Sequence, residues 1–212
     1  MRRAWTLALL GSWLALGGGT VAVAGNIPSL TVFAAADLGF AFKEIVPRFE
    51  KAVGAKVSLV LGSSGNLATQ IEHGAPADVF FSADEAFVDR LASRGAVIAE
   101  TRTAYAQGRI VLATAKSFGP KLSDLQALAD ARIRHVAIAN PLHAPYGKAA
   151  EEALRKVGIW EAVKPKLVYS ENIRHTLQFI QTGAAEAGIV ALSVANVPER
   201  SEERRVGKEC RL

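Results

Sequence analysis

The stretch Gly62-Ser63-Ser64-Gly65-Asn66-Leu67 joins a predicted strand to a predicted helix. Residues 56–61 alternate and are rich in β-branched side chains, whereas the residues from Leu67 to Ile71 follow helical spacing. Two hydroxyls and two glycines at such a junction direct free backbone N–H and Ser O–H groups toward one point. With the helix dipole, these donors can bind an anion without a cation. The alternative is that Ser64 only caps the helix.

A second strand-to-helix turn lies earlier in the chain. Residues 30–34 form a predicted strand, and Ala35-Ala36-Asp37 leads into a helix that carries Phe40, Ile45 and Phe49. Two such turns in succession place two helix N-termini at the carboxyl ends of adjacent parallel strands. The sequence therefore predicts that both turns face one site.

Strands and helices continue to alternate along the chain. The pattern predicts strands at 78–81, 109–113, 135–139, 166–170 and 187–191, with helices between them. Ser82 and Glu85 have the spacing of a capping box at the start of one helix. Such alternation implies right-handed crossovers and mostly parallel sheets. We expect an α/β protein of two lobes with a ligand-binding cleft between them.

The N-terminal 24 residues have the pattern of a secretory signal peptide. Arg2 and Arg3 precede an apolar run over 4–16, and small residues end at Ala24. The apolar run is shorter than the roughly 20 residues that span a membrane. The sequence predicts cleavage after Ala24 and a mature protein outside the cytoplasm.

The C-terminal residues 200–212 differ in composition from the Ala-rich chain before them. They resemble the in-frame translation of a sequencing-library adapter, and the alternative is a charged, solvated tail. On the first interpretation the genuine sequence stops at Glu199 and part of the first lobe is missing. The expected division is 25–83 with 192–199 as the first lobe and 84–191 as the second.

Charge and cysteine content exclude several classes of protein. Residues 25–199 carry 18 basic and 17 acidic residues, so the high pI of the whole chain does not indicate nucleic-acid or membrane binding. The single cysteine, Cys210, lies in the suspect tail. This excludes a disulfide framework and a thiol nucleophile.

Several groups of residues, in family order and spacing over nearly all of 28–195, resemble the periplasmic molybdate-binding proteins of ABC importers. The most specific is the run from Gly74 to Asp84, Gly-Ala-Pro-Ala-Asp-Val-Phe-Phe-Ser-Ala-Asp. The others are 32–36, 62–72, Asn140-Pro141 with His143, Pro145 and Gly147, 170–174, and 188–190. The resemblance implies two α/β lobes that close on molybdate or tungstate. It further implies a periplasmic monomer without enzymatic activity, cofactor or nucleic-acid partner, working with the membrane permease of an ABC importer.

The resemblance also implies which residues bind the oxyanion. The family's second binding serine falls on Ser64, with Ser63 beside it, and its backbone donors fall on Tyr146 and Ile173. Ser64, Tyr146 and Ile173 are therefore expected to hold the molybdate.

Two positions depart from the family pattern. Asp37 stands in place of the first binding serine, and Ala191 in place of a tyrosine, with Ser193 two residues further on. An ionised Asp37 that faced the ligand would repel a dianion. We expect its side chain to turn away and cap a helix that begins at Leu38.

Other functions remain open at this point. A binding protein for another oxyanion, sulfate or phosphate, is the nearest alternative, and an exported serine hydrolase that uses Ser64 is a remote one. The Gly62–Gly65 turn lacks the G-x-S-x-G spacing of a hydrolase elbow. The four histidines are scattered without metal-ligand spacing and are expected at the surface or at helix caps. A regulator's effector domain shares such a fold, but the signal peptide argues against it.

Overall fold

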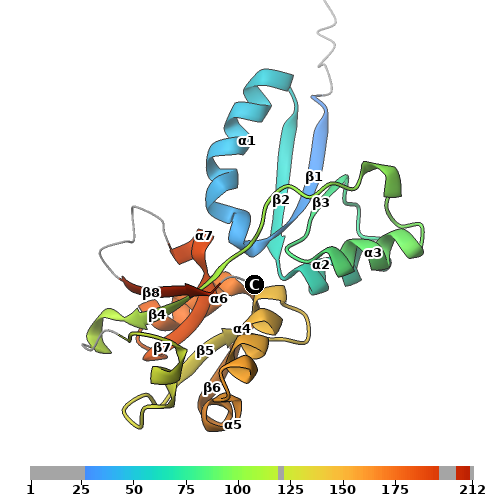
Figure 1. Cartoon of the computed structure of the whole chain (residues 1–212). Helices are drawn as coiled ribbons and strands as arrows, with labels where there is room; N and C mark the ends of the chain where they lie inside the picture. The colour runs from blue at the N-terminus through green and yellow to red at the C-terminus, as the bar shows by residue number, and fades with distance from the viewer. Residues whose placement is uncertain (1–26, 119–121, 196–203, 211–212) are drawn as a thin grey trace, which may run out of the picture.

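The chain forms two lobes, each built around one β-sheet with helices packed on it (Figure 1). The structure is a computed structural model, and it describes residues 27–118, 122–195 and 204–210. The predicted signal peptide and its cleavage site lie outside the described residues. The described part holds no helix that is both long and apolar enough to cross a membrane.

The first lobe contains a three-stranded parallel sheet with β1 at its centre. Its strands are β1 (Ser29–Ala35), β2 (Lys56–Gly62) and β3 (Val79–Phe81). A short 3-10 turn (Ala36–Leu38) follows β1, and the helices are α1 (Gly39–Val53), α2 (Ser64–Glu72) and α3 (Glu85–Ser93). Each strand therefore leads toward the N-terminus of a helix at the same edge of the sheet, which is where ligands bind in such folds.

The second lobe contains a five-stranded sheet in the order β6-β5-β7-β4-β8. Its strands are β4 (Ile110–Ala115), β5 (Val136–Ala139), β6 (Leu167–Ser170), β7 (Ala187–Ala191) and β8 (Arg204–Cys210). β5 pairs in parallel with β6 and β7, whereas β4 runs antiparallel to β7 and β8. The helices are α4 (Pro145–Lys156), α5 (Trp160–Val163), α6 (Ile173–Gln181) and α7 (Leu192–Ala195).

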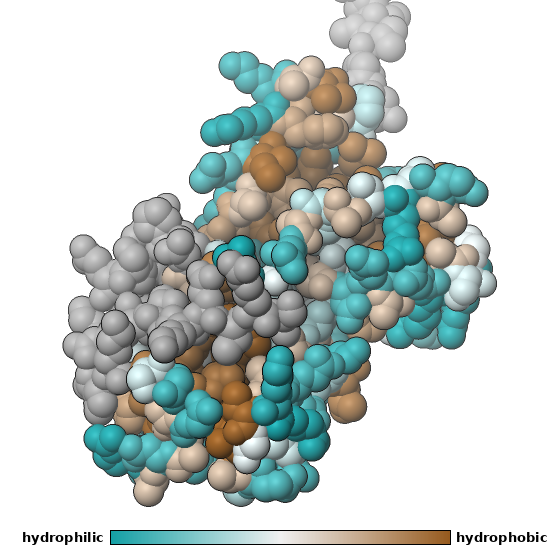
Figure 2. Space-filling view, viewed as in Figure 1, coloured by the Kyte–Doolittle hydropathy of each residue, from teal (hydrophilic) through white to brown (hydrophobic). Residues whose placement is uncertain are grey.

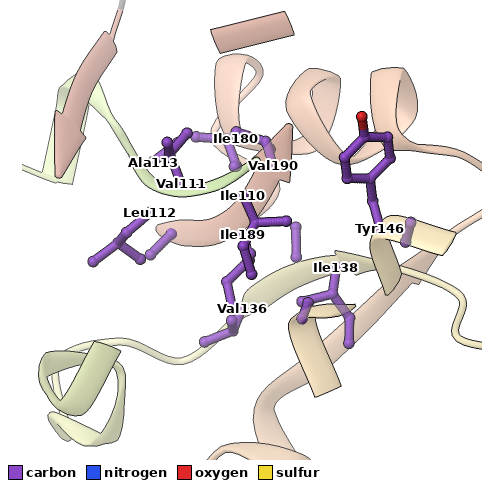
Figure 3. Close-up of a cluster of buried hydrophobic side chains, with 14 of the residues drawn as sticks. Ile110, Val111, Leu112, Ala113, Val136, Ile138, Tyr146, Ile180, Ile189 and Val190 are labelled. Carbon is purple, nitrogen blue, oxygen red and sulfur yellow. The ribbon is translucent and has the colours of Figure 1, made fainter. Parts of the chain in front are cut away.

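The larger hydrophobic core lies in the second lobe. Strands β4, β5 and β7 are buried along their whole length, as Figure 3 illustrates with Ile110, Val136 and Ile189. This burial accounts for their continuous apolar sequences, because helices cover a buried sheet on both faces. The first lobe has a small core around Val32, Ala34 and Phe42.

Helix α1 of the first lobe is apolar on a face that is not covered. Ile45 and Val53 are exposed, and Figure 2 shows apolar residues on the surface of this helix. Since Phe42 is buried against the sheet, α1 has one covered and one uncovered apolar side.

The predicted α/β class, with sheets that are mostly parallel, is confirmed, and each predicted strand is present. The predicted capping box at Ser82 is wrong. Asp84 caps α3 by accepting a hydrogen bond from the Ala86 N–H at 2.9 Å, while the Ser82 hydroxyl donates to the Asp84 carbonyl. The antiparallel direction of β4 was not predicted, because the pattern of a buried strand carries no information about direction.

The packing of α3 bears on where the first lobe ends. α3 packs on α2, and the Arg90 Nε lies 2.8 Å from the Glu72 Oε1. We propose from this packing that the chain first crosses between the lobes in the segment 102–109, after α3, and the expected division near Ala83 stays a prediction. Residues 204–210 of the suspect tail form β8 beside β4. The adapter origin of residues 200–212 stays a prediction.

Candidate functional site

A small cavity of about 10 Å³ lies where the two lobes meet. The residues that line it come from three helix N-termini, from the 3-10 turn after β1 and from Ala83 after β3. They are Ala35, Ala36, Asp37, Gly62, Ser63, Ser64, Ala83, Ala144, Pro145, Tyr146, Asn172 and Ile173. The five residues that the sequence singled out for the ligand, Asp37, Ser63, Ser64, Tyr146 and Ile173, are thus brought together. Their role in binding stays a prediction.

Ser64 is the first residue of α2 and is completely buried. Its hydroxyl oxygen accepts a hydrogen bond from the Ala83 N–H at 3.0 Å. Because that bond uses a lone pair, the hydroxyl hydrogen can be donated to a ligand. The alternative that Ser64 caps α2 is wrong, since Ser63 occupies the cap position and its side chain makes no capping hydrogen bond.

Ser63 and Gly65 contact the second lobe through one residue, His143. The Ser63 Oγ lies 3.0 Å from the His143 Nδ1, and the Gly65 N–H donates to the His143 carbonyl at 2.9 Å. A Cβ on Gly65 would lie only 2.6 Å from that carbonyl oxygen. This close approach requires glycine, as the sequence has it.

The other two predicted donors are backbone N–H groups in the first turns of α4 and α6. Pro145 is the first residue of α4 and Tyr146 the second, so the Tyr146 N–H has no partner within its own helix. At α6, the Asn172 Oδ1 accepts from the N–H groups of Arg174 and His175. The N–H of Ile173, which lines the cavity, takes no part in that cap.

The expected position of Asp37 is wrong in two respects. The residue lies within the 3-10 turn, α1 begins at Gly39, and neither is capped by a side chain. The carboxylate reaches across to the second lobe, where its Oδ2 accepts a hydrogen bond from the Tyr146 hydroxyl at 2.8 Å. In Figure 3 that hydroxyl points away from the aliphatic cluster of the second lobe.

Burial perturbs the titration of Asp37 and of two tyrosines near it. Loss of solvent raises the pKa of Asp37 to about 6, although the Tyr146 hydroxyl, the Asp37 backbone and the nearby Ser193 side chain oppose the rise. Burial and the Asp37 charge raise the pKa of Tyr105 to about 12. The same two causes raise the pKa of Tyr146 well above its usual value. Of these three groups, Asp37 has the pKa that lies nearest to neutral pH.

The arrangement favours an anion over a metal cation. Amide and hydroxyl donors converge on the cavity with the positive ends of α2, α4 and α6. The lining residues include no Lys, Arg or His, and one acid. In the described part of the chain, no group of three or more His, Cys, Asp or Glu residues could hold a metal ion.

Sequence reasoning did not find two residues that shape the site. His143 was expected at the surface or a cap, yet it bonds to Ser63. Asn172 anchors α6 so that Ile173 faces the cavity. Their place in the sequence could have indicated a role at the site, because each residue lies between the end of a strand and the start of a helix.

Comparisons with known proteins agree with this architecture. The profile of the bacterial extracellular solute-binding protein family matches residues 30–206. The molybdate-binding protein ModA of Azotobacter vinelandii is 41% identical over 182 residues, which cover 85% of this chain and 71% of the relative. ModA of Escherichia coli K12 is 34% identical, over 96% and 84% of the two chains. ModA of Rhodobacter capsulatus is 38% identical over 71% of this chain, and the match spans 59% of that relative.

Solved structures show the same similarity. The periplasmic molybdate-binding protein of Azotobacter vinelandii superimposes with a TM-score of 0.74 and 32% identity, over 86% of this chain and 78% of that one. The sulfate-binding protein SubI of Mycobacterium tuberculosis has a TM-score of 0.71 at 18% identity over 85% of this chain and 71% of that one, a likeness of fold alone. The chain belongs to the bacterial extracellular solute-binding protein family, among the relatives of the molybdate-binding protein ModA.

Proposed function

We propose that this chain is the extracytoplasmic solute-binding component of an ABC importer and that it captures molybdate or tungstate. The observation that carries the proposal is the convergence of helix N-termini and two serine hydroxyls on a cavity lined by no cation. Tetrahedral oxyanions are the ligands that such a set of neutral donors suits. The choice of anion is supported by the relatives from Azotobacter vinelandii and Escherichia coli, which are named as molybdate-binding proteins.

Four groups of this chain are assigned to the oxyanion. The hydroxyls of Ser63 and Ser64 and the N–H groups of Tyr146 and Ile173 would each donate to an oxygen atom of the anion. Hydrogen bonds to an ionised acceptor are about twice as strong as neutral ones. The metal atom itself bonds to no protein atom, so molybdate is cargo and no cofactor is needed.

The cavity must enlarge before it can hold a five-atom anion. Its volume of about 10 Å³ is close to the minimum for one water molecule. Bonds from Ser63 and Gly65 to His143, and from Asn66 to Glu171, join the lobes at its edge. We infer that the lobes separate to admit the anion and then close on it, a hinge motion common among ligand-binding proteins.

The two alternative functions are an enzyme and a binding protein for another anion. The relatives are binding proteins and not enzymes, so this chain is not an enzyme and the hydrolase alternative is set aside. Sulfate or phosphate remains the alternative ligand. Sulfate has the charge and shape of molybdate but shorter bonds, so donors placed for the larger anion would not reach its oxygens.

The expected partner is the membrane permease of the importer, and the expected state is a monomer.

Calorimetric titration of the full chain with molybdate, tungstate, sulfate and phosphate tests the proposal. We expect saturable one-to-one binding of molybdate and tungstate, and at least tenfold weaker binding of sulfate. Equal or tighter binding of sulfate would contradict the choice of ligand. If none of the four anions bound, the proposed function itself would be wrong.

A further inference from the structure

Asp37 is an acid placed among donors that suit an anion. It is the one charged residue among those that line the cavity, and only 6% of its surface is exposed. Its Oδ2 accepts the Tyr146 hydroxyl, whereas its buried Oδ1 has no hydrogen-bond partner. An unpaired buried carboxylate oxygen is costly, so its presence at this point needs a functional explanation.

The groups that face Asp37 come from four parts of the chain and do not neutralise its charge. They are the hydroxyl of Tyr146 on α4, Tyr105 in the crossing segment, Ser193 on α7 and the Asp37 backbone. The guanidinium of Arg174, from α6, lies 5.2 Å from the Phe40 ring centroid and close to Gly39. No Lys, Arg or His is among the groups that perturb Asp37. Burial raises the pKa of Asp37 to about 6. A modest further rise of this pKa is therefore enough to protonate the carboxyl at neutral pH.

A bound dianion would raise the pKa of Asp37 further. Two negative charges beside an ionised Asp37 would repel it strongly, because charges that are largely shielded from solvent interact through a low effective dielectric constant. Protonation of Oδ1 removes the repulsion and converts the unpaired acceptor into an O–H donor. The Oδ2 can still accept from Tyr146, so the contact between the lobes is preserved.

We propose that the closed site takes up one proton with each dianion and that the Oδ1 of Asp37 holds this proton. The inference rests on the proposed function and deepens it. On closure an O–H bond forms at Oδ1 with a proton from solvent, the oxyanion keeps its own charge, and that proton returns to solvent when the lobes open. Capture of the anion is therefore linked to pH through this single carboxyl.

Calorimetry of the full chain with sodium molybdate tests the inference directly. At pH 7.5, the binding heat in two buffers of different ionisation enthalpy gives the number of protons taken up. We expect about one proton per molybdate, and a dissociation constant that rises about tenfold per pH unit between pH 6.5 and 8.5. Molybdate remains a dianion over this range, so the proton belongs to the protein.

Two variants identify the group that holds the proton. Asp37→Asn keeps an acceptor for Tyr146 and adds a neutral N–H donor, so binding should lose both proton uptake and pH dependence. Tyr146→Phe removes a hydrogen bond that lowers the pKa of Asp37, so the pH at which affinity begins to fall should rise. Glu44→Gln, on the exposed surface of α1, is the matched control for loss of a negative charge and should behave as the unmodified chain.

The outcomes separate this inference from the function on which it rests. Molybdate binding without proton uptake would overturn the inference and leave the proposed function standing. Proton uptake that persists in Asp37→Asn would also overturn it. Absence of molybdate binding at every pH from 6 to 8.5 would overturn both.

Discussion

The Ser63 hydroxyl and the His143 imidazole lie 3.0 Å apart, although one belongs to the first lobe and the other to the second. The same two turns make a backbone contact, from the Gly65 N–H to the His143 carbonyl. The N-terminus of α2 and the turn before α4 are therefore locked together at the edge of the cavity. If the lobes separate as proposed, this contact breaks, so it would contribute to the free energy of closure.

His143→Ala should weaken molybdate binding without unfolding the protein. The substitution removes the bond to Ser63 but keeps the backbone bond from Gly65. One neutral hydrogen bond contributes about 1 kcal/mol, which corresponds to a roughly fivefold increase in the dissociation constant. The control is His73→Ala, because the His73 imidazole bonds to the Thr69 carbonyl at the end of α2 and does not line the cavity. Equal effects of the two substitutions in calorimetry would contradict a role for His143 in closure.

Gly65→Ala should hold the lobes apart. The new Cβ would meet the His143 carbonyl oxygen at 2.6 Å and its Cα at 2.9 Å, and both belong to backbone that cannot rotate away. Because alanine is a better helix former than glycine, α2 itself should not be weakened. We expect at least tenfold weaker molybdate binding with an unchanged or higher melting temperature. Gln70→Ala, on the exposed side of the same helix, is the control. Unchanged affinity of Gly65→Ala would show that the lobes need not approach so closely.

Ser64→Ala should reduce both affinity and stability. The variant loses an assigned donor to the anion and leaves the Ala83 N–H without its acceptor. An unsatisfied buried group costs about 1–3 kcal/mol. Thermal melting and calorimetry should therefore both respond, whereas Ser93→Ala, at an exposed position of α3, should change neither. A lower melting temperature with normal molybdate affinity would mean that Ser64 supports the fold and does not contact the anion.

The sequence predicted the positions of strands more reliably than their direction. Periodicity located β5 and β7, whose apolar runs are continuous because both faces are buried. It could not tell that β4 runs antiparallel, since direction depends on pairing between distant segments. The residues that cap helices were harder to predict than the direction of the strands. Ser82 and Asp84 both suit a cap, and the choice between them depends on backbone angles that sequence spacing does not determine.

Turn chemistry pointed to Ser63 and Ser64, whereas Tyr146 and Ile173 were expected only from the resemblance to the molybdate-binding family. The structure brings these residues to one cavity from two different sheets, because strand ends of both lobes meet there. The side chain of Asp37 was expected to act locally. Its actual partner, Tyr146, is 109 positions away and becomes visible only when the two lobes are assembled.

Ionisation of Asp37 should destabilise the closed protein at neutral pH, and Asp37→Asn should relieve this. The pKa of Asp37 is raised from 3.8 to about 6 by burial, so between these values the folded state binds more protons than the unfolded state. The contribution of Asp37 to the free energy of unfolding is therefore most favourable below pH 4, falls as the pH rises to 6, and is constant above pH 6. The loss amounts to at most about 3 kcal/mol, from 1.36 kcal/mol per pKa unit.

Thermal melting without ligand at pH 4.5 and pH 7.5 measures this difference. We expect Asp37→Asn to melt several degrees higher than the unmodified chain at pH 7.5, since about 1 kcal/mol shifts the melting temperature of a protein this size by roughly 2–4 °C. At pH 4.5 the two should differ much less, because the carboxyl is then protonated in the folded state. Glu44→Gln, at an exposed position, should show no such pH-dependent gain. An equal gain for Asp37→Asn at both pH values would mean that the charge of Asp37 is not the source of the cost.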